Sequence, residues 1–183
     1  MKKAFFSFLL SFTLVGPHLA GAAGATSDCG RAGPGAEFCS GATFARVDAG
    51  QTRGMSFWMH RAGYLSKVLV QEMPQEGARR GDIEAAIISI VSQQASSIGR
   101  SFEFSDISSS TRGGAPFGTL TYTLSGQSGD KPILHSYVAV KGVVVQVISQ
   151  LAVKTADPGP QALHAAHRDA VAAIHLKGPG SDI

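Results

Sequence analysis

Three histidines near the C-terminus, His164, His167 and His175, are of a residue type that could bind a metal ion. Residues three apart on a helix lie on the same side, so His164 and His167 could ligate one ion. On the expected helix, however, His167 falls within the apolar arc and the other two histidines lie at its edge. Asp169 projects away, so no acidic side chain completes the set. We therefore predict no bound metal, and we expect His167 to face a sheet as a core residue.

A catalytic serine is the second chemistry that the residue types allow. Ser136 and His135 could join one of several aspartates in a nucleophile–base–acid set, but any chain of this size offers as many combinations. Ser128 and Lys131 match the S-x-x-K spacing, which requires the start of a helix, whereas here it spans a Gly-rich loop. The sequence contains no G-x-S-x-G motif. We expect a protein that is not an enzyme and that carries no cofactor.

Residues 1–25 have the order of a secretory signal peptide. Two lysines precede the apolar run Ala4–Val15, and two small-residue cleavage sites follow, Ala20-Gly21-Ala22 and Ala23-Gly24-Ala25. The apolar run is shorter than the roughly 20 residues that a membrane-spanning helix needs. We predict cleavage near residues 22–25, a mature chain without a membrane span, and a periplasmic or secreted location.

Cys29 and Cys39 follow this leader in a Gly-rich stretch. Exported proteins fold in oxidising compartments, where two nearby cysteines form a disulfide by default. A reactive thiol pair is the alternative, but the spacing is not C-x-x-C. We predict a structural Cys29–Cys39 bridge.

The net charge argues against a nucleic-acid partner. The chain has 16 Lys and Arg against 13 Asp and Glu. Without Lys2 and Lys3 of the leader, 14 basic and 13 acidic residues remain, a net charge of +1. Such a mature domain has no electrostatic attraction for nucleic acid or for an anionic membrane. We expect neither as a partner.

A concentration of large apolar and basic side chains in the first half of the chain is of the composition that protein interfaces favour. The candidate partner-binding residues are Met55, Trp58, Met59, Tyr64, Arg79 and Arg80. Alternation along a strand puts Phe57 and Trp58 on opposite sides, so both sides of this strand carry large apolar groups. Either both sides are covered, or one is exposed for a partner. If Trp58 is the exposed anchor, the region 55–73 and the loop 74–81 form the contact surface; if it is core, Trp58 is an ordinary buried tryptophan and the site is not located.

The elements that position these residues follow from hydrophobic periodicity. Strands are expected at 42–48, 55–60, 66–73, 101–107, 117–125, 133–141 and 143–151, and helices at 82–98 and 161–176. Asp82 is the expected N-cap of the first helix, whose apolar side includes Ile83, Ile87 and Ile98, and Gly99 ends it. The order predicts an α+β fold, an antiparallel sheet of about six to seven strands with one mid-chain helix and one C-terminal helix packed on it.

Three regions surround or make up this fold. Residues 26–41 are expected to form a Gly-rich, disulfide-closed N-terminal segment. Residues 42–177 are expected to form a single domain. Residues 178–183 are expected to be a flexible tail.

From Asp82 to Leu176 the chain resembles the small exported α+β domains of the PsbP and DcrB type. The matching stretches are the helix DIEAAIISIVSQQ, the strands FEF and GTLTY, the hairpin YVAVKGVVVQVIS and the helix HAAHRDAVAAI. The likeness lies in element order and hydrophobic pattern. It implies a non-enzymatic domain that binds proteins or supports an assembly, and it carries over no site residues.

These observations predict an exported cell-envelope protein that binds or assembles through protein–protein contact, with an inhibitor- or immunity-like role as one version. The alternative is a periplasmic domain that binds a small molecule or lipid in a cavity lined by Val145, Val147 and Ile174. A hydrolase with an unrecognised site is a third reading, and the absence of a nucleophile or metal motif counts against it.

Overall fold

The computed structural model describes residues 29–48, 54–72, 79–112, 114–127, 129–140, 142–152 and 159–176. The expected leader, Met73, residues 74–78 and the expected tail lie outside these ranges. The strands are β1 (Cys29–Gly33), β2 (Ala36–Cys39), β3 (Phe44–Val47), β4 (Met55–His60), β5 (Tyr64–Glu72), β6 (Ser101–Arg112), β7 (Ala115–Ser125), β8 (Lys131–Val140), β9 (Val143–Leu151) and β10 (Ile174–Leu176). The helices are α1 (Arg80–Ser97) and α2 (Pro160–Ala172).

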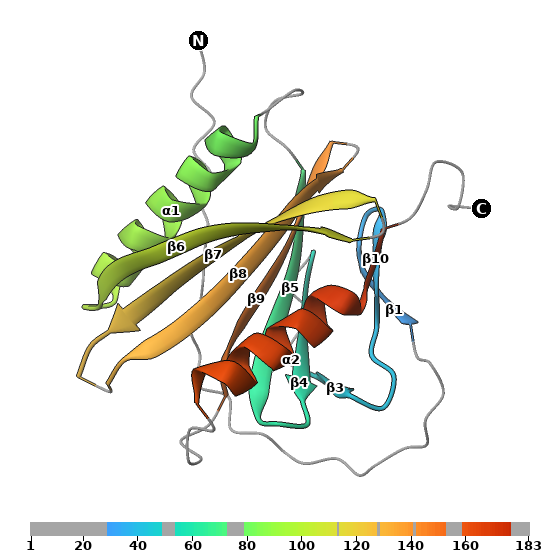
Figure 1. The fold of residues 1–183 in the computed structure, drawn as a ribbon, viewed down its shortest axis with the longest axis horizontal. Helices are drawn as coiled ribbons and strands as arrows, with labels where there is room; N and C mark the ends of the chain where they lie inside the picture. The colour runs from blue at the N-terminus through green and yellow to red at the C-terminus, as the bar shows by residue number, and fades with distance from the viewer. Residues whose placement is uncertain are drawn as a thin grey trace.

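Seven strands form one antiparallel sheet in the order β3-β4-β5-β9-β8-β7-β6, and β1, β2 and β10 form a second, three-stranded sheet (Figure 1). The predicted α+β class, with a large antiparallel sheet and two packed helices, is confirmed. Tight hairpins join the meander; Gly142, for example, has φ of 78° between β8 and β9, a conformation that favours glycine.

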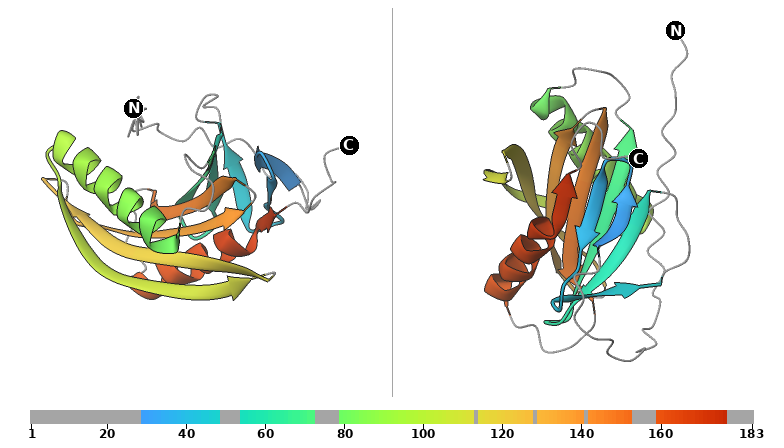
Figure 2. Two further views of the ribbon diagram at one scale, coloured as in Figure 1. Left: turned by 90° about the horizontal axis from the view of Figure 1, so that it is seen from above. Right: turned by 90° about the vertical axis from the view of Figure 1, so that its right-hand side faces the viewer.

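The two helices lie on opposite sides of the curved seven-stranded sheet (Figure 2). We call the two sides the α1 face and the α2 face. On the α1 face, Ile83, Ile87 and Ala95 of α1 join Leu120, Tyr122, Leu124, Ile133, Tyr137 and Val144 in one buried cluster. On the α2 face, α2 and the small sheet together bury Val68, Val138, Val145 and Val147. The central strands are thus buried on both sides, which explains their long apolar runs.

Helix α1 begins two residues earlier than the sequence predicts. Arg79 precedes the first turn, and the Asp82 carboxylate accepts a hydrogen bond from the Arg79 backbone N–H at 3.0 Å. Asp82 therefore caps from inside the first turn, so its expected position as N-cap is wrong by three residues. Gly99, with φ of 68°, follows the helix end as predicted, but Ile98 is 47% exposed and does not belong to the buried side.

The closing helix is shorter than predicted. Helix α2 ends at Ala172, and Ile174–Leu176 forms β10 instead of a last helical turn. Ile174 lies opposite Phe38, and Leu176 lies opposite Ala36, both of β2. This pairing joins residues far apart in the sequence, so the helical periodicity of 161–176 could not reveal it.

The N-terminal Gly-rich segment packs with the domain rather than apart from it. Its described part forms the hairpin β1–β2, which the sequence analysis did not expect, and it contributes Ala32, Ala36 and Phe38 to the core of the α2 face. A side chain at Gly33 would collide with Val70 of β5, so the glycine allows the hairpin to approach the large sheet closely. Cys29 and Cys39 lie opposite each other in this hairpin and are bonded.

Replacing both cysteines by alanine should lower the free energy of unfolding by about 2–3 kcal/mol, because the bridge restricts a short loop of the unfolded chain. Urea denaturation of the double variant beside the oxidised protein measures this loss. The hairpin holds Phe38 in the core, so the far-UV circular dichroism of the folded state should not change. Equal stabilities of the two proteins would show that the bridge contributes nothing.

Candidate functional site

A chain of buried polar side chains joins α2 to the large sheet. Nε2 of His167 lies 2.7 Å from the Ser136 hydroxyl, and Nδ1 of His167 lies 2.9 Å from the Ser149 hydroxyl. Ser149 is in turn hydrogen-bonded to Ser66 at 2.9 Å, and Ser136 to Thr119 at 2.6 Å. His167 is 4% exposed, so the prediction that it faces the sheet is confirmed.

This chain contains a serine–histidine pair but not a catalytic site. No carboxylate is hydrogen-bonded to His167 at either ring nitrogen, since both nitrogens meet serine hydroxyls. Ser136 and Ser149 are each 1% exposed or less, so a substrate has no access to the pair. His135, which the sequence placed beside Ser136 as a possible partner, lies on the opposite face of β8. This chain of hydrogen-bonded side chains therefore holds α2 in a fixed position on the sheet.

The structure places the three histidines considered as metal ligands in different surroundings. His164 and His175 are exposed, while His167 is buried. Among residues of the described ranges, no group of three or more His, Cys, Asp and Glu side chains could hold an ion. Likewise, no helix within those ranges is long and apolar enough to cross a membrane.

A second set of polar side chains lies on the α1 face. The Gln146 amide nitrogen donates to Gln71 at 2.6 Å, so the Gln146 carbonyl oxygen is free to accept from Nε2 of His135 at 2.8 Å. His135 is therefore the Nε2-protonated tautomer, and its buried Nδ1 has no hydrogen-bond partner among the described residues. Burial lowers the pKa of His135 to about 4, so its ring is neutral at pH 7.

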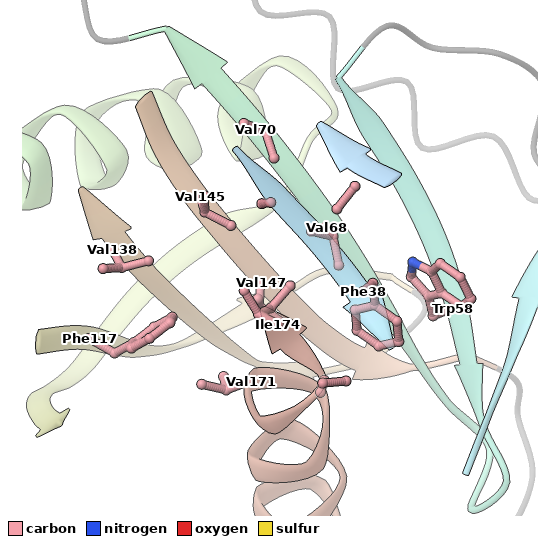
Figure 3. Close-up of a cluster of buried hydrophobic side chains, with 14 of the residues drawn as sticks. Phe38, Trp58, Val68, Val70, Phe117, Val138, Val145, Val147, Val171 and Ile174 are labelled. Carbon is pink, nitrogen blue, oxygen red and sulfur yellow. The ribbon is translucent and has the colours of Figure 1, made fainter. Parts of the chain in front are cut away.

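Strand β4 separates the predicted interface residues onto two sides. Ser56, Trp58 and His60 are buried on the α2 face, whereas Met55, Phe57 and Met59 are partly exposed on the α1 face. Trp58 is 3% exposed and stacks on Phe38 with ring centroids 4.4 Å apart (Figure 3). Its indole N–H donates to Ser56 at 3.0 Å. The hypothesis that Trp58 is an exposed anchor is wrong, because the N-terminal hairpin, which the sequence analysis did not foresee, covers it.

Two more of the predicted interface residues have structural roles. Tyr64 is 1% exposed and packs with Leu163 and Ala166 of α2. Arg80 is exposed, but its guanidinium is engaged by Glu84 at 2.8 Å, by the Tyr137 hydroxyl at 3.1 Å and by the Ser108 carbonyl at 3.1 Å. Arg80 therefore joins α1 to the sheet. Arg79 is exposed beside the start of α1.

The carboxylate of Glu84 completes this junction by accepting a hydrogen bond from the Tyr137 hydroxyl. Partial burial raises the pKa of Glu84, but the bonds from Tyr137 and Arg80 outweigh this and lower it below its ordinary value. Burial and the bond to Glu84 raise the pKa of Tyr137 to about 12. A side chain at Gly118, directly opposite Tyr137, would collide with the Tyr137 ring. The glycine thus leaves room for the ring that reaches Glu84 and Arg80.

The remaining interface candidates belong to a continuous surface, which we call the open face. Cross-strand register places Phe57 opposite Lys67, Met59 opposite Leu65, and Lys67 opposite Ile148. The open face comprises Met55, Phe57, Met59, Leu65, Lys67 and Ile148, all partly exposed. Helix α1 contacts the other end of this side of the sheet, at β6 and β7. Among the described residues, the buried cluster that α1 forms with the sheet includes no residue of β4.

The sequence placed Met55, Phe57 and Met59 on one side of a strand, but it did not reveal Leu65, Lys67 and Ile148 as their neighbours. Alternation along β4 separates Phe57 from Trp58, and this signal was available. Which side of β4 is buried, however, depends on where the distant hairpin β1–β2 packs. The pairing of β5 with β9, which brings Ile148 beside Lys67, joins strands separated by more than seventy residues.

The α+β architecture expected from the element order is confirmed, and the fold is similar to that of PsbP. The solution structure of cyanobacterial PsbP (CyanoP) from Synechocystis sp. PCC 6803 matches with a TM-score of 0.60 and 17% identity, over 88% of this chain and 99% of that chain. At this identity the likeness shows the fold alone.

Two other solved structures show lower similarity. The Pseudomonas aeruginosa protein PA94 matches at 11% identity and TM-score 0.49, over 74% of this chain and 99% of that chain. LpqN, involved in cell envelope biogenesis of Mycobacterium tuberculosis, matches at 11% identity and TM-score 0.47, over 78% and 83%. No family model and no curated protein matches the chain.

Trp58→Ala should lower the free energy of unfolding by about 3–5 kcal/mol, because it empties a packed position between Phe38 and the large sheet. Phe57→Ala, one residue away on the partly exposed side, is the matched control and should lose less than half as much. Urea denaturation of both variants decides the matter. A loss below about 1 kcal/mol for Trp58→Ala would contradict the burial of the indole in the core.

Acid should destabilise the fold through His167 and His135. Burial, with smaller contributions from His135 and His164, lowers the pKa of His167 to about 3. Between pH 6.5 and the folded-state values, the unfolded chain binds protons that the folded chain does not, so stability falls as pH falls. Each histidine contributes a slope of up to about 1.4 kcal/mol per pH unit.

Urea denaturation at pH 7, 6 and 5 measures this slope. The His167→Gln variant should have a lower free energy of unfolding at pH 7. Its free energy of unfolding should also depend less steeply on pH, because one of the two buried histidines no longer contributes to the slope. His175→Gln, an exposed control on β10, should keep the full slope. An unchanged slope in His167→Gln would contradict a buried neutral ring.

Proposed function

We propose that this protein is an exported, non-enzymatic accessory protein of the cell envelope, and that it binds another protein through the open face. Export is supported by the charged, apolar and small-residue order of the leader and by a bonded cysteine pair close behind it. The predicted cleavage near residues 22–25 and the periplasmic or secreted location belong to this proposal.

The observation that carries the proposal is the alternation of β4. The residues of β4 that face the core have partners within the fold. Trp58 stacks on Phe38, and His60 contacts Asp169 of α2 at 3.3 Å. The outward residues Met55, Phe57 and Met59 are large, apolar and partly exposed. Methionine and aromatic side chains are enriched in the centres of protein interfaces.

The alternative of a lipid or small-molecule site has less support. Its expected lining, Val145, Val147 and Ile174, packs into the buried cluster of the α2 face with Phe38 and Val171 (Figure 3). Val145 and Val147 are fully buried by these neighbours, so they face packed side chains. An enzymatic role has only the Ser136–His167 pair, which is inaccessible.

A photo-crosslinking residue placed at Phe57 in the full-length, exported protein should capture a protein partner in intact cells. The same residue at Gln161, exposed on α2 and so on the opposite side of the sheet, should not capture it. The double change Met55→Asp and Met59→Asp should reduce the Phe57 product at least tenfold with the fold intact by circular dichroism, since charges replace apolar contact area. Equal capture from Phe57 and Gln161, or none from either, would exclude the open face as the binding surface.

A further inference from the structure

Lys67 occupies the centre of the open face. It lies in the middle of β5, with Phe57 directly opposite on β4 and Ile148 directly opposite on β9. Along its own strand on the same side lie Leu65 and Leu69. The neighbours of the Lys67 side chain, along β5 and on both adjacent strands, are therefore all apolar.

Lys67 has no counter-charge within the described part of the chain. The two ion pairs there are His60–Asp169 and Arg80–Glu84. His135, next in the row beyond Ile148, is neutral, and burial raises the pKa of Tyr122, so that neither supplies a negative charge. Glu84 of α1 is held by Arg80 and Tyr137. Desolvation lowers the pKa of Lys67 to about 8, so at pH 7 most of the amine is still charged.

A cation held among apolar groups without a partner is unfavourable, and the cost is relieved when a second molecule brings an anion into the same water-excluded surface. We propose that the bound protein presents an Asp or Glu carboxylate to Lys67, within a ring of apolar side chains that pack on Met55, Phe57 and Met59. This inference rests on the proposed function and names the chemistry of the partner's contact.

A protein carboxylate fits this surface better than a phospholipid surface does. Recognition of an anionic membrane uses clusters of Lys and Arg. Lys67 is the only Lys or Arg among the residues that form the open face. One cation inside an apolar surround matches a central, desolvated ion pair enclosed by apolar contacts, which is the arrangement of an interface hot spot.

The ion pair has a consequence for pH. A carboxylate beside Lys67 favours the charged amine, so the complex holds the Lys67 proton more tightly than the free protein does. Binding should therefore be constant between about pH 6 and pH 7, where the partner's carboxylate stays ionised, and weaken as pH rises through 8 toward 9. Lys67→Arg, which stays charged over this range, should remove that dependence.

The test uses a photo-crosslinking residue at Met59 of the full-length, exported protein, combined with Lys67, Lys67→Arg, Lys67→Met or Lys67→Glu. We expect the product to fall several-fold with Met and at least tenfold with Glu, while Arg keeps most of it. Gln161→Glu adds the same negative charge on the opposite side of the sheet and should have no effect. The crosslinked partner peptide should contain Asp or Glu beside apolar residues.

Folding is checked separately, because Lys67→Met should melt at the same or a higher temperature once the desolvated charge is gone. Equal product from all four Lys67 forms would overturn the carboxylate while leaving the proposed function intact. Product from lipid in place of protein would overturn the inference in favour of a membrane contact. No product from any form would remove both the inference and the proposed function.

Discussion

The contact between Phe38 and Trp58 determines which side of β4 is core and which side is surface. Phe38 reaches Trp58 because β2 is held between β1 and β10, and Ile174 of β10 lies opposite Phe38. With the indole turned toward this small sheet, alternation along β4 turns Met55, Phe57 and Met59 the other way. The open face is thus a consequence of how the two ends of the domain meet on the α2 face.

The sequence predicted the elements that depend on neighbouring residues and missed those that depend on distant ones. Strands β4 and β9 and the hairpin turn at Gly142 follow from periodicity and turn chemistry, and helix α1 needed a shift of only two residues at its start. Strand β10 could not be foreseen, since Ile174–Leu176 continues a helical pattern and becomes a strand only because β2 offers it hydrogen bonds. The orientation of Trp58 was undetermined for the same reason, because its cover is the β1–β2 hairpin.

The candidate site was only partly predictable on the same grounds. Composition alone identified Met55 and Met59, since methionine and aromatic clusters are typical of interfaces. Arg80 was included for its charge, but its role follows from a contact with Tyr137, fifty-seven residues away, which no local pattern contains. Lys67 looked like an ordinary polar position in a strand until β4 and β9 placed Phe57 and Ile148 on either side of it.

Ser66 and Lys67, neighbours in β5, show two different surroundings for polar groups in the large sheet. Ser66 is fully buried on the α2 face, and its hydroxyl joins Ser149 and, through it, His167, so the polar group is satisfied within the fold. Lys67, one residue on, points to the α1 face and meets apolar neighbours without a counter-charge from the described residues. The fold completes its hydrogen bonding where α2 covers the sheet and leaves a charge uncompensated on β5, outside the buried cluster that α1 forms with the sheet. A partly desolvated charge without a counter-charge is unfavourable in the free protein, so a surface that retains one is better suited to being completed by another molecule than to remaining in water.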